Sequence, residues 1–194
     1  MLGEVLQFLK ERVNEHLRIS AGWRPTDPEQ ELVAFPGSDK VDSPDFKAER
    51  VTLLLVNLEE DHTLRPADPH RRLSPDGSVQ QVKPPIHVNA YVLFVARFKE
   101  YEKSAQHVSR ILHLFQGRRV FDHGSAPGLP GKVEKLTMEL ISLPFSEQNH
   151  LWGVLRAVYH PSLLYKVRMV VFQDEAGLTA PVVTETGVLV KREP

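Results

Sequence analysis

Histidine is the residue of this chain best suited to metal or acid–base chemistry, and the chain contains nine of them. Zinc enzymes hold their metal through ligands at short fixed spacings such as His-Glu-x-x-His, and no two of the nine have that or a similar spacing. Cysteine is absent, which excludes disulfides and thiolate metal ligands. We interpret the histidines as a dispersed, solvated set and expect no metal and no other cofactor. The nine are His16, His62, His70, His87, His107, His113, His123, His150 and His160.

One short run, Asp122-His123-Gly124-Ser125, contains the three residue types of a hydrolytic triad. Residues adjacent in sequence cannot easily point at one another in Ser-His-Asp geometry, and the Gly-x-Ser-x-Gly elbow is absent. A small hydrolase using His123 and Ser125 would also need a deep pocket that brings a distant carboxylate to the histidine. It remains a distant alternative, and we predict no acyl-transfer activity.

Two further patterns bear on ligand binding. Glu59-Glu60-Asp61 could coordinate a hard cation at the end of a strand, but carboxylates at an exposed strand end are usually solvated. The turn from Gly124 to Gly131 contains three glycines but neither Gly-Lys-Ser/Thr nor Gly-x-Gly-x-x-Gly, so it has little in common with a phosphate-binding loop. We therefore predict that the chain is not an enzyme.

Length and composition indicate a single domain spanning residues 1–194. The 194 residues can bury a sizeable core, and 41% hydrophobic with 25% charged residues is ordinary globular composition. Lys plus Arg number 24 against 25 for Asp plus Glu, so the formal charge is −1 and no broad nucleic-acid footprint is indicated. No stretch approaches the roughly 18 apolar residues that span a bilayer, and no basic leader precedes an apolar run. We expect a soluble protein made in the cytoplasm, without stable membrane insertion.

Two segments have the apolar spacing of amphipathic helices. The first is Leu2 to Ile19, in which Phe8 lies off the main apolar stripe and either widens the buried face or contacts a neighbouring subunit. The second is Tyr101 to Phe115, for which Gly117 is a suitable C-cap residue. Its predicted stripe consists of Tyr101, Ala105, Val108, Leu112 and Phe115.

A third helix is predicted from Glu147 to Tyr159. Ser146 can cap its N-terminus, and Pro161 prevents its continuation. We interpret Trp152 as a core anchor rather than an interaction hot spot, and the adjacent Gly153 as a position of close backbone approach.

The strands differ in how they are buried. Val51 to Leu58 and Val88 to Phe98 are apolar on both alternating faces, which is typical of central strands covered from two sides. In a third strand Leu136, Met138 and Leu140 alternate with polar residues, so one of its faces is exposed. A fourth strand, 163–171, alternates in the same way and places Lys166 and Arg168 on a solvent or partner face. The pattern predicts an α+β domain with an antiparallel-rich mixed sheet and about three packed helices.

Prolines mark two long loops, at residues 22–46 and 61–85. The second carries Arg71 and Arg72 and cannot bury enough apolar surface to fold alone, so a partner could be what orders it. A last strand is predicted at 182–191 and includes Val182, Val188 and Val190. It could pair with its own sheet or be lent to a neighbouring protein, and both readings stay open.

The block from Gly131 to Gln173 has a distinctive centre, Pro144-Phe-Ser-Glu-Gln-Asn-His-Leu-Trp-Gly153. Together with other strings in the same order, it closely resembles the tail-terminator or cap proteins of contractile injection systems. These are phage-tail-like particles that include the antifeeding prophage and the Photorhabdus virulence cassette. The other strings are the opening amphipathic helix, Val51 to Glu60, Pro84 to Phe94, Ile111 to Gly117, Val120-Phe121 and Pro127 to Pro130.

The resemblance implies a structural cap with a tail-terminator-like fold. Such a protein would form a ring, expected to be a homohexamer, on the distal end of the inner tube, end tube polymerisation and anchor the last sheath layer. Its partners would be itself, the inner-tube protein and the sheath protein, with assembly in the cytoplasm into a particle that can be released. A baseplate or connector component is the alternative.

The resemblance assigns no contact residues, and our interface candidates come from the patterns above. They are Arg71, Arg72, Lys166 and Arg168, with Val182, Val188 and Val190 from the segment 182–191.

Overall fold

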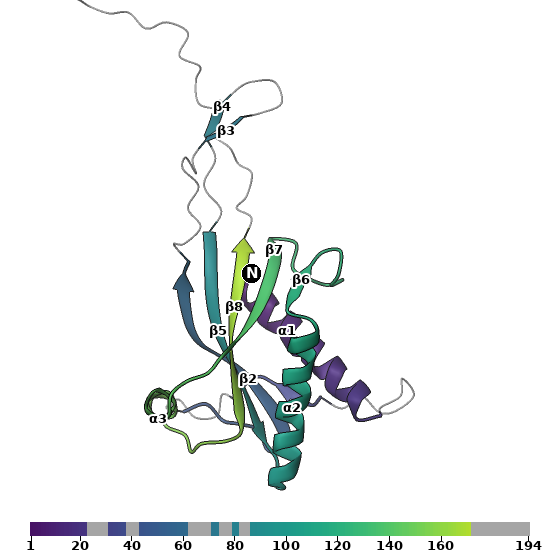
Figure 1. The fold of residues 1–194 in the computed structure, drawn as a ribbon, viewed down its shortest axis with the longest axis vertical. Helices are drawn as coiled ribbons and strands as arrows, with labels where there is room; N and C mark the ends of the chain where they lie inside the picture. The colour runs from purple at the N-terminus through teal and green to yellow at the C-terminus, as the bar shows by residue number, and fades with distance from the viewer. Residues whose placement is uncertain (23–30, 38–42, 62–70, 74–78, 82–85, 172–194) are drawn as a thin grey trace, which may run out of the picture.

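The structure is a computed structural model that describes residues 1–22, 31–37, 43–61, 71–73, 79–81 and 86–171 (Figure 1). Within these ranges it contains three helices, a six-stranded sheet and a separate two-stranded sheet. The predicted α+β class with a mixed, antiparallel-rich sheet is confirmed. In chain order the elements are α1 (Leu2–Ser20), β1 (Val33–Ala34), β2 (Arg50–Glu60), β3 (Arg71–Leu73), β4 (Val79–Gln81), β5 (Ile86–Arg97), α2 (Tyr101–Gly117), β6 (Val120–Asp122), β7 (Val133–Ile141), α3 (Phe145–Val154) and β8 (Ser162–Val171).

The strand order of the large sheet is β1-β2-β5-β8-β7-β6. Only β1 and β2 pair in parallel, and the other four pairs are antiparallel. Both edge strands are short, because β1 has two residues and β6 has three. The sheet is therefore built around the long strands β2, β5, β8 and β7.

Helices cover both faces of this sheet. On one face α1 and α2 bury Leu9, Val13 and Phe115 against β5 and β8. On the opposite face α3 buries Trp152 against Leu93 and other residues of β5 and β8. Figure 1 shows α3 at the lower left and the other two helices on the right. This arrangement explains why β2 and β5 are apolar at successive positions, since each face of their central portions meets a different helix.

The first helix agrees with its predicted bounds within one residue. Phe8 is buried, and its side chain meets that of Phe121 edge to face with the centroids 5.7 Å apart. Phe8 therefore widens the buried face of α1, and the alternative of a contact with another subunit is not needed to explain it.

The buried stripe of α2 is displaced from the predicted one. The buried positions are Ser104, Ile111 and Phe115, whereas Tyr101 is 74% exposed and Leu112 is 37% exposed. The buried hydroxyl of Ser104 is satisfied, because it accepts a hydrogen bond from the backbone N–H of Phe98 at 3.2 Å. Gly117 is the last helical residue, and Arg118, in an extended conformation, takes the C-cap position.

The predicted third helix was too long. It begins at Phe145, with Pro144 rather than Ser146 at the N-cap, and it ends at Val154. Arg156 follows with φ 50°, in the left-handed region that does not continue an α-helix. Tyr159 therefore belongs to the segment that returns toward β8.

The two predicted loops contain short strands that the sequence did not indicate. The segment 22–46 includes β1, and 61–85 includes β3 and β4, which pair with each other antiparallel. The predicted strand at 182–191 lies outside the described residues. Strands of two or three residues have too few positions for an alternation pattern, which is why they escaped prediction.

Candidate functional site

The most exposed apolar surface of the described chain lies on α3 and the segment after it. Phe145 is 91% exposed, Val154 82%, Val158 81% and Tyr159 56%. Phe145, Val158 and Tyr159 line one hollow together with Trp152, which is 5% exposed, and these four residues form what we call the apolar shelf. Scattered exposed hydrophobic residues are ordinary on protein surfaces, but a contiguous group marks a site of interaction.

Backbone geometry at both ends of α3 creates the shelf. At the start, the N–H of Gln148 donates to the carbonyl of Pro144 at 2.9 Å and so forms the first helical turn. At the end, the N–H of Ala157 donates to the carbonyl of Trp152 at 3.3 Å, next to Arg156 with its positive φ. A left-handed non-glycine residue costs about 1–2 kcal/mol. Reversing the chain here brings Val158 and Tyr159 back alongside the helix.

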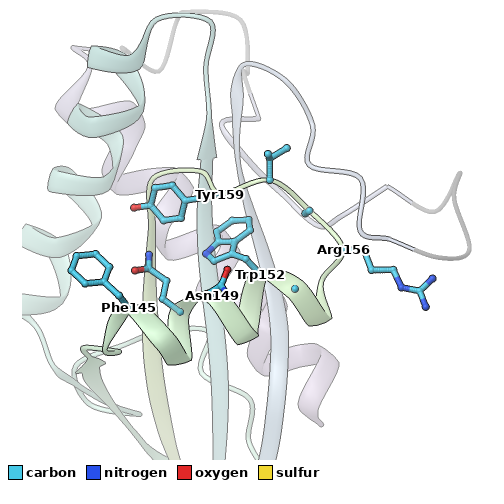
Figure 2. Close-up of a pocket in the computed structure, with 9 residues that line it drawn as sticks. Phe145, Asn149, Trp152, Arg156 and Tyr159 are labelled. Atoms are coloured by element: carbon cyan, nitrogen blue, oxygen red, sulfur yellow. The ribbon is translucent and has the colours of Figure 1, made fainter.

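Trp152 fixes the shelf to the sheet. Its side chain packs edge to face against Phe46 at 5.8 Å, Tyr159 at 5.5 Å and His160 at 6.2 Å between centroids. Figure 2 shows the side chains of Trp152 and Tyr159 approaching one another above α3. Burial lowers the pKa of His160, and the nearby Arg97 lowers it further. Trp152 is thus the core anchor that the sequence predicted.

Gly153 does not make the predicted close backbone approach. A Cβ added at this position would meet no atom within 4 Å. The glycine is exposed and leaves open space beside Trp152, so a shallow hollow of about 580 Å³ forms over the shelf.

The chemistry of this hollow is that of a binding surface. Arg156 is the one charged residue among its described lining, and in Figure 2 its side chain extends away from α3. Asn149 and Gln148 supply amides. The described lining includes no carboxylate, histidine, lysine, serine, threonine or cysteine, and the hydroxyl of Tyr159 is its one group of a type used in general acid–base or covalent catalysis.

The predicted interface residues Lys166 and Arg168 lie on the α3 face of the sheet, farther along β8 than the buried Leu164. The Lys166 ammonium lies 5.9 Å from the centroid of the Tyr91 ring, and Arg168 Nε lies 3.7 Å from Glu139 Oε2. Both cations therefore already have neighbours within the chain.

Tyr91 extends this polar region toward β2. Its hydroxyl donates to Glu59 Oε2 at 2.9 Å, and this bond is the main reason why the pKa of Tyr91 is raised. Glu59 thus engages a tyrosine of the same chain. Within the described residues, no group of three or more His, Cys, Asp and Glu side chains is arranged to hold a metal ion.

The other interface candidates are placed only in part. Arg71 and Arg72 belong to β3, where they pair with Gln81 and Gln80 of β4, but their side chains are not described. Val182, Val188 and Val190 lie outside the described residues. Of the candidates with described side chains, neither Lys166 nor Arg168 lines the hollow of the apolar shelf. Phe145 could have signalled the shelf, because it lies seven residues before Trp152 and therefore on the same face of α3, next to the hollow.

The run containing Asp122, His123 and Ser125 forms a closed turn after β6. The Ser125 N–H donates to Asp122 Oδ1 at 2.8 Å, and the Asp122 N–H donates to Ser125 Oγ at 3.2 Å. The side-chain hydrogen bond from Ser125 is the largest cause of the lowered pKa of Asp122. Both side chains thus bond to the backbone of the turn, and His123 is exposed. This geometry is that of a turn rather than a triad.

None of the helices in the described residues is both long and apolar enough to cross a membrane.

Comparisons with known proteins give two kinds of match. A family model described as the Pvc16 N-terminal domain matches residues 4–185. No curated protein sequence matches the chain. Two cryo-EM structures share its fold, and 94% of the chain is covered in each.

One of the two is the sheath/tube terminator of the PVC extracellular contractile injection system in its extended state, with TM-score 0.50, 17% identity and 63% of that chain covered. The other is the tube-terminating cap of the anti-feeding prophage, with TM-score 0.54, 17% identity and 60% of that chain covered. The chain thus spans somewhat less than two thirds of the length of these proteins. At 17% identity, the two matches establish a shared fold and nothing more.

Proposed function

The chain belongs to the Pvc16 N-terminal domain family, and we propose that it is the structural cap, or tail terminator, of a contractile injection system. The observation that carries this proposal is the nature of the two structures that share its fold. One is described as a sheath/tube terminator and the other as a tube-terminating cap. Both descriptions name a component that terminates a tube.

The work of such a cap is mechanical. It presents one surface that the last tube layer accepts and another that cannot be extended, so polymerisation stops and the sheath has an anchor. An exposed apolar surface suits this role, because burying Phe145, Val158 and Tyr159 against a partner would contribute about 25 cal/mol for each Å² of apolar area removed from water. No catalytic group is needed.

Ring formation is the second part of the proposal. A cap that seats on a tube of rotational symmetry must match that symmetry, and we propose a homohexamer that contacts the inner-tube and sheath proteins. Rings arise from head-to-tail contacts between two different surfaces of the same chain. A single contact of this kind can be weak in solution and become stable when a tube end holds all copies together. Assembly would take place in the cytoplasm, before any release of the particle.

A baseplate or connector component is the competing role, because it would also lack catalytic residues. The descriptions of both similar structures favour the terminator. A hydrolase receives no support from the turn at Asp122, in which Ser125 is bonded to the backbone.

The decisive experiment is electron microscopy of particles assembled with a tagged form of the chain. We expect the tag at the end distal to the baseplate, in a copy number equal to the rotational symmetry of the tube. Particles assembled without the chain should have tubes of uneven length. Label at the baseplate, or a copy number that does not match the tube, would rule out the cap.

A matched variant tests the enzymatic alternative in the same assay. His123→Ala/Ser125→Ala should cap particles as the wild type does, because neither residue has a catalytic role in the proposal. A hydrolytic activity present in the wild type and lost in this double variant would contradict the assignment.

A further inference from the structure

We infer that the apolar shelf of one copy docks on a hollow beside α1 of the next copy and so forms the ring contact. This inference rests on the proposed cap function. The hollow, which we call the acidic hollow, lies between the N-terminal half of α1 and the turn that precedes β7. Its principal lining residues are Glu4, Gln7, Glu11, Gly128, Pro130 and Gly131.

The floor of the acidic hollow offers room for large side chains. Gly128 adopts φ 93° and Gly131 has open space where a Cβ would lie, so neither position fills the hollow. Arg12 holds this turn against α1 through a hydrogen bond from its guanidinium to the carbonyl of Pro127. The turn is thus fixed in place, and a protruding aromatic residue such as Phe145 can pack above it.

Charge favours this hollow over two others on the described surface. The shelf carries one cation, Arg156. A groove that already contains cations would repel it. The groove between α2 and β7 is lined by two cations, Arg119 and Arg168, and by one carboxylate, Glu139.

The hollow at the end of the sheet also contains two cations, Lys135 and Arg168, together with Asp61. By contrast, the acidic hollow is lined by Glu4 and Glu11 and by no cation among its described lining residues. The guanidinium of Arg12 lies at its edge, but it is already bonded to the carbonyl of Pro127 and paired with Glu15. The acidic hollow is therefore the surface that best complements Arg156.

Both carboxylates keep the capacity to accept from Arg156. Glu11 accepts one hydrogen bond, from Gln7 at 2.7 Å, and Glu4 lies 3.5 Å from the amino group of Met1. A carboxylate has about four acceptor positions, so one neighbour leaves the others available. The contact of Glu4 is exposed, and such pairs contribute little.

The positions of the two surfaces in the fold suit a ring. Trp152 anchors the shelf in the core on one face of the sheet, and α1 belongs to the core on the other face. One copy can therefore engage one neighbour through its shelf and a second neighbour through its acidic hollow. A contact between two different surfaces is heterologous and closes into a ring at the correct rotation. Two shelves facing each other would instead bring like charges together at Arg156.

Engineered disulfides can test this contact directly, because the chain has no cysteine of its own. Val158→Cys places a thiol on the shelf, and Gln7→Cys places one on the rim of the acidic hollow. Particles capped by the double variant and then oxidised should release a ladder of covalent oligomers. The two single variants mixed should stop at covalent dimers, because each supplies half of one contact. Either single variant alone should stay monomeric.

A second pair is the matched control. Tyr101→Cys lies on α2 at a residue that is 74% exposed and belongs to neither surface. Combined with Val158→Cys, it should give no ladder. Covalent dimers of Val158→Cys alone would show that the shelf pairs with itself and would overturn the inference. Capped particles without a ladder in the Val158→Cys/Gln7→Cys variant would overturn it too, while leaving the cap function intact. Particles that lack the chain at their distal end would instead refute the cap function.

Charge reversal tests the role of Arg156. In solution, Arg156→Glu introduced into the Val158→Cys/Gln7→Cys variant should raise the protein concentration needed for half-maximal disulfide cross-linking about tenfold, because attraction to the acidic hollow becomes repulsion. Glu11→Arg should have the same effect. The double reversal should restore cross-linking to near the level of the Val158→Cys/Gln7→Cys variant, and a double reversal that cross-links more weakly than either single reversal would contradict the pairing.

Discussion

Trp152 and Phe145 are two large aromatic residues of the same short helix that serve opposite purposes. Trp152 is 5% exposed and contacts Phe46, Tyr159 and His160, whereas Phe145 is 91% exposed. Trp152→Ala should lower the free energy of unfolding by about 3–5 kcal/mol, because it leaves a cavity. Phe145→Ala should change it by less than about 0.5 kcal/mol. Urea unfolding of both variants measures the difference.

The same two variants separate folding from assembly. Phe145→Ala should unfold like the wild type and yet cap particles poorly. Equal losses of stability in the two variants would show that Phe145 is part of the core and that the shelf is not a free surface.

The sequence indicated the role of Trp152 but not the shelf around it. A tryptophan at the centre of a helical segment usually faces the core, and this one does. Gly153 was misjudged because a glycine beside a large residue suggests close packing, whereas here it borders open space. Phe145 was missed because a phenylalanine just after a strand-ending proline is read as another core residue. Its 91% exposure depends on where α3 lies relative to β7, which no local pattern specifies.

At the scale of elements, long segments were predicted well and short ones were not. α1, β2, β5, β7 and β8 have nine or more residues each, so their periodicity is repeated often enough to be recognised. β1, β3, β4 and β6 have two or three residues each. α3 was predicted to end at Tyr159, because Pro161 was the visible stop signal. The actual end depends on the left-handed conformation of Arg156.

The N-terminal part of α2 should make stability depend on pH. His107 stacks on Phe98 with the centroids 4.1 Å apart, and its Nδ1 lies 2.7 Å from the carbonyl oxygen of Lys103. Burial is the largest cause that lowers the pKa of His107, and the nearby Arg110 lowers it further. Protonation therefore favours the unfolded chain. The contribution is fully present above the unfolded pKa of about 6.5 and is lost as the pH falls from there through the folded pKa.

We expect the free energy of unfolding to decline between pH 7.5 and pH 5, values chosen to lie on either side of the ordinary histidine pKa of about 6.5. The free energy of unfolding of His107→Gln should decline less over this range, because glutamine does not titrate. His160 also has a lowered pKa, so part of the decline should remain. His113→Gln, at an exposed position of the same helix, is the control and should decline as the wild type does. Identical pH profiles for His107→Gln and the wild type would exclude this role.

For the whole molecule, the fold and the family could be anticipated from strings spread along most of the chain. The surfaces through which we propose that the cap assembles could not be anticipated in this way. The acidic hollow combines segments far apart in sequence, since Gly128 lies beside α1. The shelf is held in place by a distant residue, since Phe46 packs against Trp152. Contacts of this kind form only when the sheet is complete. A single sequence therefore does not show which segments meet, or which surface of a neighbouring protein they contact.

The described sheet also offers edges to an added strand. β1 pairs with β2 only at Val51 and Thr52, and β6 pairs with β7 only from Lys135 to Thr137. Within the described residues the rest of both outer edges lacks a strand partner. The segment 182–191 alternates like a strand, and an isolated strand gains its hydrogen bonds only at such an edge. An edge on a neighbouring protein serves as well as one on its own chain.

We predict that this segment acts between proteins, and deletion of the chain after Asp174 tests it. The truncated monomer should keep nearly the full melting temperature, because no strand of its own sheet is lost. Particles assembled with it should lose the cap or vary in length. Removal of residues 192–194 alone is the matched control, since it leaves the predicted strand intact, and it should change neither property. If truncation after Asp174 instead lowers the melting temperature of the monomer by more than about 4 °C, the change expected for roughly 1 kcal/mol in a domain of up to about 250 residues, the segment belongs to its own sheet.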